Sequence, residues 1–175
     1  MAIPPQLPEL IDLARAFPDT TIVLNHCGGV LGIGAYEGKR DEVFRHWSTA
    51  ISELARCPNV HVKLGGLGMR INGFGFERGD DPPTSEQLAN TWRPYIQVCI
   101  EAFGAKRCLF ESNFPVDKGS YSYGTCWNAF KRLTEGASPP ERDALFRRNA
   151  ITLYRLAEVL GLGPVASDPH NVGQT

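Results

Sequence analysis

Apolar residues recur at helical spacing in five stretches of the chain, and three short β-rich runs lie between them. In the first stretch, residues 6–17, Leu7, Ile11 and Ala14 share one face, which predicts an amphipathic helix that ends near Pro18. Thr84 with Gln87, and Ser138 with Glu141, have the spacing of capping boxes that open helices. The other predicted helices are 41–57, 84–104, a shorter one around 127–133, and 138–161.

The three β-rich runs are residues 21–25, 60–64 and 108–112. Each run follows one predicted helix and precedes another, and successive runs start about 40 residues apart. Antiparallel neighbours would need only a short turn, so this alternation predicts parallel strands joined by right-handed crossovers. The fold class is therefore α/β.

The connections differ on the two sides of the predicted strands. The links from helix to strand take about three residues, whereas the links that leave the strands, 27–40, 65–84 and 113–122, are long and rich in glycine. Long loops at the carboxyl ends of parallel strands carry the ligand sites of barrels and open α/β sheets. We expect the functional site there, within a domain of residues 1–160, and we expect residues 161–175 to form a flexible tail.

Charge and composition exclude several classes of partner. With 18 basic and 19 acidic side chains the net charge is −1, so nucleic acid is not an expected partner, and neither is an anionic membrane. No apolar run approaches membrane-spanning length, and the first residues lack the pattern of a secretory signal, which predicts a cytoplasmic protein. The five cysteines show no CxxC spacing and are expected to be small buried hydrophobic residues.

Two polar residues follow the first and third predicted strands. His26 comes one residue after the first strand and precedes two glycines, where an imidazole can transfer a proton or bind a metal. A histidine that only caps the strand end is the structural alternative. Asn113 follows the third strand, and its carboxamide can orient substrate or water but cannot act as a general base. We predict His26 and Asn113 as catalytic residues.

Lys63 and Asp117 are predicted to bind substrate. Strand alternation places Lys63 and Glu111 on the same face, where Lys63 could meet an anionic substrate group or form a buried ion pair with Glu111. The ion pair is the interpretation that the residues alone favour. Asp117 lies in the loop after the third strand, where a solvated turn acid paired with Lys118 is the structural alternative.

Two further chemical roles have weaker support in the sequence. Cys27 next to His26 suggests a thiol nucleophile, but neighbours along a strand point to opposite faces, so the two side chains would not share a proton. Residues 28–34 suggest a loop that binds a phosphate ligand, although the glycine spacing does not match a phosphate-binding motif and no helix follows at once.

Three segments, residues 24–28, 62–65 and especially 107–117, resemble the carboxyl-terminal half of the amidohydrolase-related family of TIM-barrel hydrolases. The resemblance runs from Gln6 to Leu156. It implies that the three strands are the sixth, seventh and eighth of a (β/α)8 barrel. It also implies hydrolysis of a C–O or C–N bond in a small carboxylated metabolite, as in lactonases.

The same resemblance implies roles for two residues. His26 matches the sixth-strand histidine that polarises substrate or helps to activate water, and Asn113 stands where the family has an aspartate that binds metal or acts as base. A divalent metal, zinc or manganese, is implied as well, but the first-strand His-x-His pair and the fifth-strand histidine have no counterpart, so no residue is assigned as a metal ligand. We therefore expect a partial TIM barrel with a small-molecule substrate.

The alternative is a non-catalytic barrel fragment or subunit that needs a partner or an amino-terminal half. A complete barrel takes about 250 residues, and three parallel strands alone leave two unpaired edges. Association into a homo-oligomer is one way to cover these edges.

Overall fold

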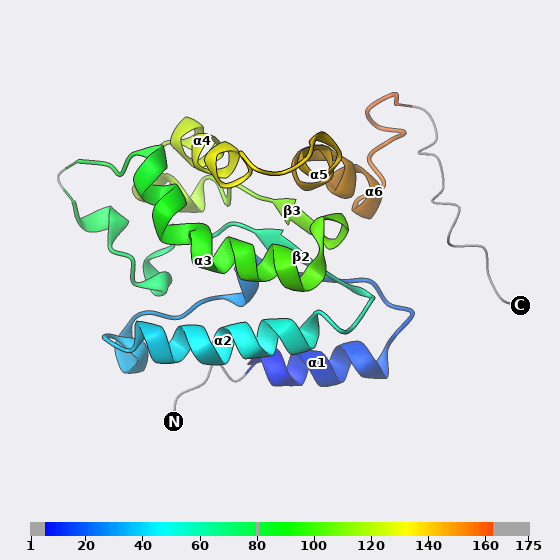
Figure 1. The fold of residues 1–175 in the computed structure, drawn as a ribbon, viewed down its shortest axis with the longest axis horizontal. Coiled ribbons are helices and arrows are strands. Elements are labelled where there is room, and N and C mark those ends of the chain that lie inside the picture. Colours follow the sequence, from blue (N-terminus) through cyan, green and yellow to red (C-terminus); the bar gives the residue numbers. More distant parts are fainter. Residues whose placement is uncertain (1–5, 80, 163–175) are drawn as a thin grey trace, which may run out of the picture.

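The computed structural model describes residues 6–79 and 81–162, and it contains a three-stranded parallel sheet flanked by helices (Figure 1). The strands are β1 (Ile22–Leu24), β2 (Val60–Leu64) and β3 (Cys108–Phe110), in the order β1-β2-β3. Ile22 is in register with Val60, and Val62 with Cys108. The predicted α/β class and the parallel pairing are confirmed. β1 and β3 are shorter than predicted, by residues 21 and 25 in β1 and by residues 111 and 112 in β3, and the backbone then turns at the left-handed residues His26 and Asn113.

The first four helices have bounds close to those that the apolar pattern predicts. The helices are α1 (Gln6–Ala16), α2 (Arg40–Leu54), α3 (Ser85–Phe103), α4 (Tyr123–Leu133), α5 (Pro139–Asp143) and α6 (Asn149–Leu153), with a π-helical turn, Ala144–Arg148, between the last two. Thr84 and Gln87 form the predicted capping box of α3.

The prediction of one helix through residues 138–161 is wrong at its carboxyl end. The helix ends at Leu153, and Arg155 has a left-handed backbone with φ of 53°. The apolar stripe continues in the sequence, but the side chains of Val159 and Leu160 are 82% and 54% exposed. Without burial against a neighbour, an apolar stripe does not stabilise further helical turns.

α1, α2 and α3 lie one above another, and α4 packs on the far side of α3 (Figure 1). Side chains in β2 alternate as predicted, with Val60, Val62 and Leu64 fully buried, while His61 and Lys63 on the opposite face are half-buried. All five cysteines are free and buried, as the sequence predicts. Within the part of the chain that the structure describes, no helix combines the length and apolar character needed to cross a membrane.

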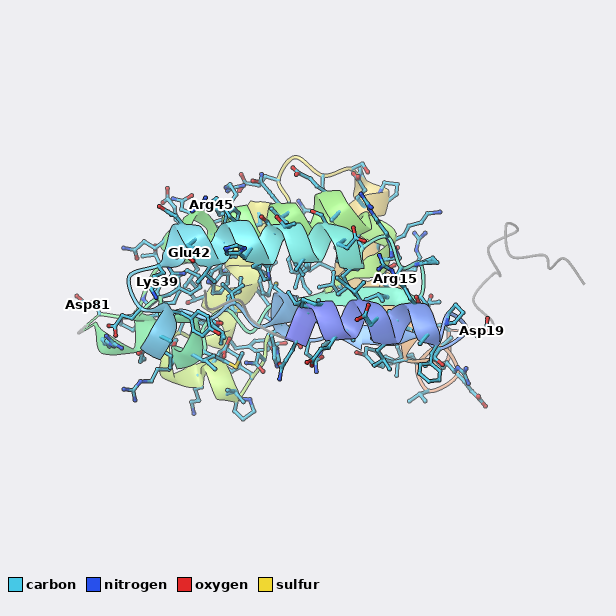
Figure 2. All side chains as sticks on the ribbon, turned by 90° about the horizontal axis from the view of Figure 1, so that it is seen from below. Arg15, Asp19, Lys39, Glu42, Arg45 and Asp81 are labelled. Carbon is cyan, nitrogen blue, oxygen red and sulfur yellow. The ribbon has the colours of Figure 1, made fainter. Side chains whose placement is uncertain are left out.

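The two ends of the sheet differ as the loop lengths predict. Arg15 and Asp19 lie at the end where short links enter the strands, and Lys39 and Asp81 lie at the opposite end, where the long loops are (Figure 2). The long loops contain short 3₁₀ turns, for example His26–Gly28 after β1 and Val116–Gly119 after β3. The predicted tail, residues 161–175, lies outside the described residues except for 161 and 162, so its flexibility stays a prediction.

Candidate active site at the carboxyl ends of the strands

His26 lies two residues beyond β1 in a left-handed backbone conformation, with φ of 54°. Its imidazole packs against Gly66 in the loop that follows β2. A Cβ atom on Gly66 would lie 2.5 Å from Nδ1 of His26, and Gly66 itself has φ of +65°. Both the space and the backbone conformation therefore require glycine at position 66. This contact holds the histidine ring over the ends of β1 and β2.

Glu111 connects all three strand ends. Its Oε1 accepts a hydrogen bond from the backbone N–H of His26 at 3.1 Å and lies 2.5 Å from Nδ1 of the same residue. Its Oε2 lies 2.5 Å from Nζ of Lys63. The Glu111 and Lys63 side chains are 10% and 23% exposed. The ion pair predicted between Lys63 and Glu111 is confirmed, and His26 joins it to form a cluster of three side chains.

Asn113 begins a second cluster, which links the loops after β2 and β3. Its Nδ2 donates to Oδ1 of Asp117 at 2.8 Å, and Oδ2 of Asp117 accepts from the hydroxyl of Tyr121 at 2.5 Å. The backbone N–H of Gly68 donates to the same Oδ2 at 3.2 Å. Asn113 has φ of 55°, a left-handed conformation that asparagine adopts more readily than most residues. The cluster fixes the carboxamide of Asn113 at the end of β3.

The structure corrects the alternative interpretation of Asp117 as a solvated turn acid paired with Lys118. Asp117 is 1% exposed, and its carboxylate bonds to Asn113, Tyr121 and Gly68. Burial raises the pKa of the Asp117 carboxyl above its usual value, although its hydrogen bonds and nearby His26 act in the opposite direction. Burial and the Asp117 carboxylate together raise the pKa of the Tyr121 phenol. The loop position suggested exposure, but the segment folds back against Gly68.

Three residues of these clusters are absent from the predicted site: Glu111, Gly68 and Tyr121. Strand alternation placed Glu111 on the face of Lys63, but nothing in a local pattern shows that His26, 85 positions earlier, turns toward it. Tyr121 lies four residues after Asp117, in a short turn that has no periodic signal. Gly68 contributes a backbone N–H, which residue type does not reveal. Each of these contacts depends on the tertiary fold.

The free atoms of the two clusters define the chemistry that the site can perform. Nδ1 of His26 faces Glu111, which leaves Nε2 as the ring nitrogen turned away from this carboxylate. The amide nitrogen of Asn113 donates to Asp117, which leaves its carbonyl oxygen as an acceptor. A histidine nitrogen that can take a proton and a fixed acceptor are the groups needed to activate and orient a water molecule.

The glycine-rich segment 28–34 does not form a phosphate-binding turn followed by a helix. The next helix, α2, begins only at Arg40, and the backbone N–H of Gly32 donates to the carbonyl of Ile71. A Cβ atom on Gly32 would lie 2.1 Å from the carbonyl oxygen of Asn72. This glycine therefore allows close packing between the loops that follow β1 and β2. Cys27, the other weak candidate, is fully buried.

The described residues do not fit a metal site by themselves. Between residues 6 and 162, with position 80 left aside, no three or more His, Cys, Asp or Glu side chains are grouped so that they could hold a metal ion. Both oxygens of the Glu111 carboxylate, and both of Asp117, are already engaged by protein donors. We therefore derive no chemical step through a metal.

Comparison with known proteins gives a consistent result. The sequence model of the family described as Amidohydrolase matches residues 2–156. The chain is 45% identical over 152 residues to the uncharacterized protein y4mH of Sinorhizobium fredii, covering 86% of this chain and 44% of the relative. It is 30% identical over 161 residues to an L-fucono-1,5-lactonase of Burkholderia ambifaria, covering 89% of this chain and 49% of that enzyme.

Solved structures share the fold. An amidohydrolase from Burkholderia multivorans, solved once with bound HEPES and once with bound zinc, superimposes with a TM-score of 0.72 at 26% sequence identity. The match covers 89% of this chain and 51% of that protein. The three parallel strands and their helices are thus part of a TIM barrel, as predicted. The chain spans about half the length of the relatives that it matches.

Proposed function

The chain belongs to the amidohydrolase family, and from this premise we propose that its strand-end clusters form part of a lactonase-like hydrolase site for a small carboxylated metabolite. The observation that carries the proposal is the fixed pair of free atoms, Nε2 of His26 and the carbonyl oxygen of Asn113, at the carboxyl end of the sheet. Relatives named L-fucono-1,5-lactonase support the choice of a lactone over an amide.

In the proposed reaction, Nε2 of His26 takes a proton from water as the water oxygen attacks the lactone carbonyl carbon. The carbonyl oxygen of Asn113 accepts the second hydrogen of this water and orients it. When the tetrahedral intermediate collapses, the acyl carbon–ring oxygen bond breaks, and His26 returns its proton to the leaving ring oxygen. The product is the open hydroxy acid.

Two further residues support this chemistry. Lys63 uses one N–H to bind Glu111 and keeps two for a carboxylate of the substrate, which matches its predicted substrate-binding role. Asp117 is enclosed by protein donors, and we propose that it acts by holding Asn113 instead of touching substrate itself. Five free thiols are typical of a reducing compartment, which favours a cytoplasmic location.

The test is hydrolysis by the purified chain of sugar lactones that carry a free carboxylate and of L-fucono-1,5-lactone, which carries none, followed by acid release with a pH indicator against an enzyme-free blank. We expect His26→Ala to lower the rate by about 100-fold or more. His46→Ala, which removes an imidazole from α2, is the matched control and should leave the rate unchanged. Turnover that survives His26→Ala would refute the proposal.

A second candidate is a barrel subunit that acts only after it associates with complementary strands. The observation that favours it is the sheet itself, in which β1 and β3 stand at the two ends and pair with no further strand of the described residues. Light scattering with size-exclusion chromatography decides this case. An inactive chain that self-associates through its edges, or binds an added amino-terminal half of a relative, would support the subunit over the enzyme.

A further inference from the structure

We propose that Glu111 is a positioning residue that holds His26 as the tautomer with its proton on Nδ1, so that Nε2 is the basic nitrogen. The catalytic meaning of this inference rests on the proposed function, but the tautomer itself does not. Strand alternation predicts an ion pair between Glu111 and Lys63. The contact between Glu111 and His26 appears only in the folded chain.

One carboxylate oxygen of Glu111 contacts both the backbone and the ring of His26. Oε1 of Glu111 accepts from the backbone N–H of His26, a group that can only donate, at 3.1 Å. The same oxygen lies 2.5 Å from Nδ1 of the His26 ring. A carboxylate oxygen has lone pairs and no hydrogen to offer, so the short contact requires the proton to be on Nδ1. Backbone and ring of His26 are therefore held by a single acceptor.

Lys63 fixes the protonation of the carboxylate from its other side. Its ammonium nitrogen lies 2.5 Å from Oε2, so that both oxygens of Glu111 face donors. The Glu111 side chain is largely buried, and charge-assisted hydrogen bonds are strong in such surroundings. A neutral carboxylic acid would lose the charge that pairs with the Lys63 ammonium. Every contact in the cluster is satisfied when Glu111 is ionised and His26 donates from Nδ1.

Gly66 bounds the His26 ring on one side. A Cβ atom on Gly66 would lie 2.5 Å from Nδ1, whereas the His26 side chain as a whole is 29% exposed. The charged or titratable groups that face His26 are Glu111 after β3, Lys63 on β2 through Glu111, and Asp117 in the following loop. Of these, Glu111 is the one in hydrogen-bond contact with the ring.

The test is long-range ¹H–¹⁵N NMR of the whole 175-residue chain with ¹⁵N-labelled histidine, which distinguishes the two neutral tautomers directly. For His26 we expect about a tenfold or larger excess of the Nδ1–H form. Histidine in water prefers the Nε2–H form, and His46 on α2 serves as the internal reference for that preference. A His26 spectrum dominated by Nε2–H in the wild-type chain would overturn the proposal.

Variants provide the second measurement. Glu111→Leu should remove the excess of Nδ1–H at His26, and Glu111→Gln should reduce it, while the His46 signals stay unchanged. Glu53→Gln, a glutamate of α2 paired with Arg15, is the matched control and should leave His26 as in the wild type. If Glu111→Leu fails to fold, the wild-type spectrum still decides. Unchanged tautomers in a folded Glu111→Leu chain would refute the role of Glu111.

The outcome is separable from that of the proposed function. A chain that shows the Nδ1–H tautomer but hydrolyses no lactone keeps the positioning role and loses the lactonase. A chain that hydrolyses lactone through His26 with the opposite tautomer keeps the activity and loses the role of Glu111.

Discussion

The amino and carboxyl ends of the same three strands use polar side chains in opposite ways. At the amino end, two side chains bind backbone carbonyls. Asn59 donates to the carbonyls of Ala14, Phe17 and Thr20. Arg107 donates to four more, those of Ala55, Cys57, Val60 and Phe103. These bonds close the short links between helices and strands, so this end of the sheet serves stability.

At the carboxyl end some side chains, such as Arg40, also bind carbonyls, but two clusters of side chains bind one another. His26, Lys63 and Glu111 form one cluster, and Asn113 with Asp117 and Tyr121 forms the other. Only about a tenth of the hydrogen bonds in a typical protein join two side chains, so their concentration here is informative. The carboxyl end is also the end at which other barrels carry their active sites, which fits the proposed function.

The largest effect is expected from the amino end. Arg107→Ala leaves four carbonyls without their donor and should lower the free energy of unfolding by about 3 kcal/mol, measured by urea denaturation. Arg56→Ala is the control, because this arginine is 76% exposed and pairs only with Glu53, so the loss should be about 0.5 kcal/mol or less. Equal losses in the two variants would contradict the division between the two ends.

Two glycines with positive φ sharpen the comparison. Gly66 and Gly104 both have positive φ, +65° and +73°, but a Cβ on Gly66 meets His26 whereas a Cβ on Gly104 meets nothing within 4 Å. Gly104→Ala should cost about 1 kcal/mol from backbone strain alone. Gly66→Ala should cost about 2 kcal/mol and should also displace the His26 ring.

The measurements for this pair are urea denaturation and the NMR signals of His26. If Gly66→Ala leaves the His26 signals unchanged, or if Gly104→Ala moves them, the contact between Gly66 and the histidine ring has been misjudged.

The smallest effect is a pH dependence at Asp117. Burial raises the folded pKa of this carboxyl above its unfolded value of 3.8, so between these two values the folded state binds more protons than the unfolded state. Its contribution to stability is therefore present at acid pH and is lost as the pH rises through the folded pKa.

Asp117→Asn removes this titration. The unfolding free energy of the wild type minus that of the variant, measured by urea denaturation at a series of pH values, should fall as the pH rises above 3.8. Exposed Glu141 and Asp143 have lowered pKa values and act with the opposite sign, but they are common to both proteins and cancel. A difference that grows with pH would contradict a raised pKa at Asp117.

Much of the fold could be predicted because its signals are local. The periods of 3.6 and 2 located five helices and all three strands, and the capping residues Thr84 and Ser138 marked two helix starts. The error at residues 154–161 has the same origin. A periodic stripe indicates that a helix would be amphipathic, but whether Leu160 finds a surface to pack against is decided by the rest of the fold.

The site could be predicted by position but not by contact. Strand ends and glycine-rich loops indicated where His26, Lys63 and Asn113 would lie. The partner of His26 is 85 residues away, and the burial of Asp117 depends on a loop that follows a different strand. Residue spacing along the chain therefore does not predict these contacts. The catalytic and substrate-binding roles of the four predicted residues stay predictions until activity is measured.

The close approach of Gly32 and Gly73 limits how a new specificity could be engineered into this scaffold. A Cβ on either glycine would lie within 2.2 Å of a carbonyl oxygen of the opposite loop, and Arg40 binds the carbonyls of Asn72 and Gly73. The loops that follow β1 and β2 are thus held together where Gly32 and Gly73 meet. Segments 33–38, 74–79 and 81–84 lie beyond it, and libraries of altered enzymes should vary these segments while leaving the joined positions untouched.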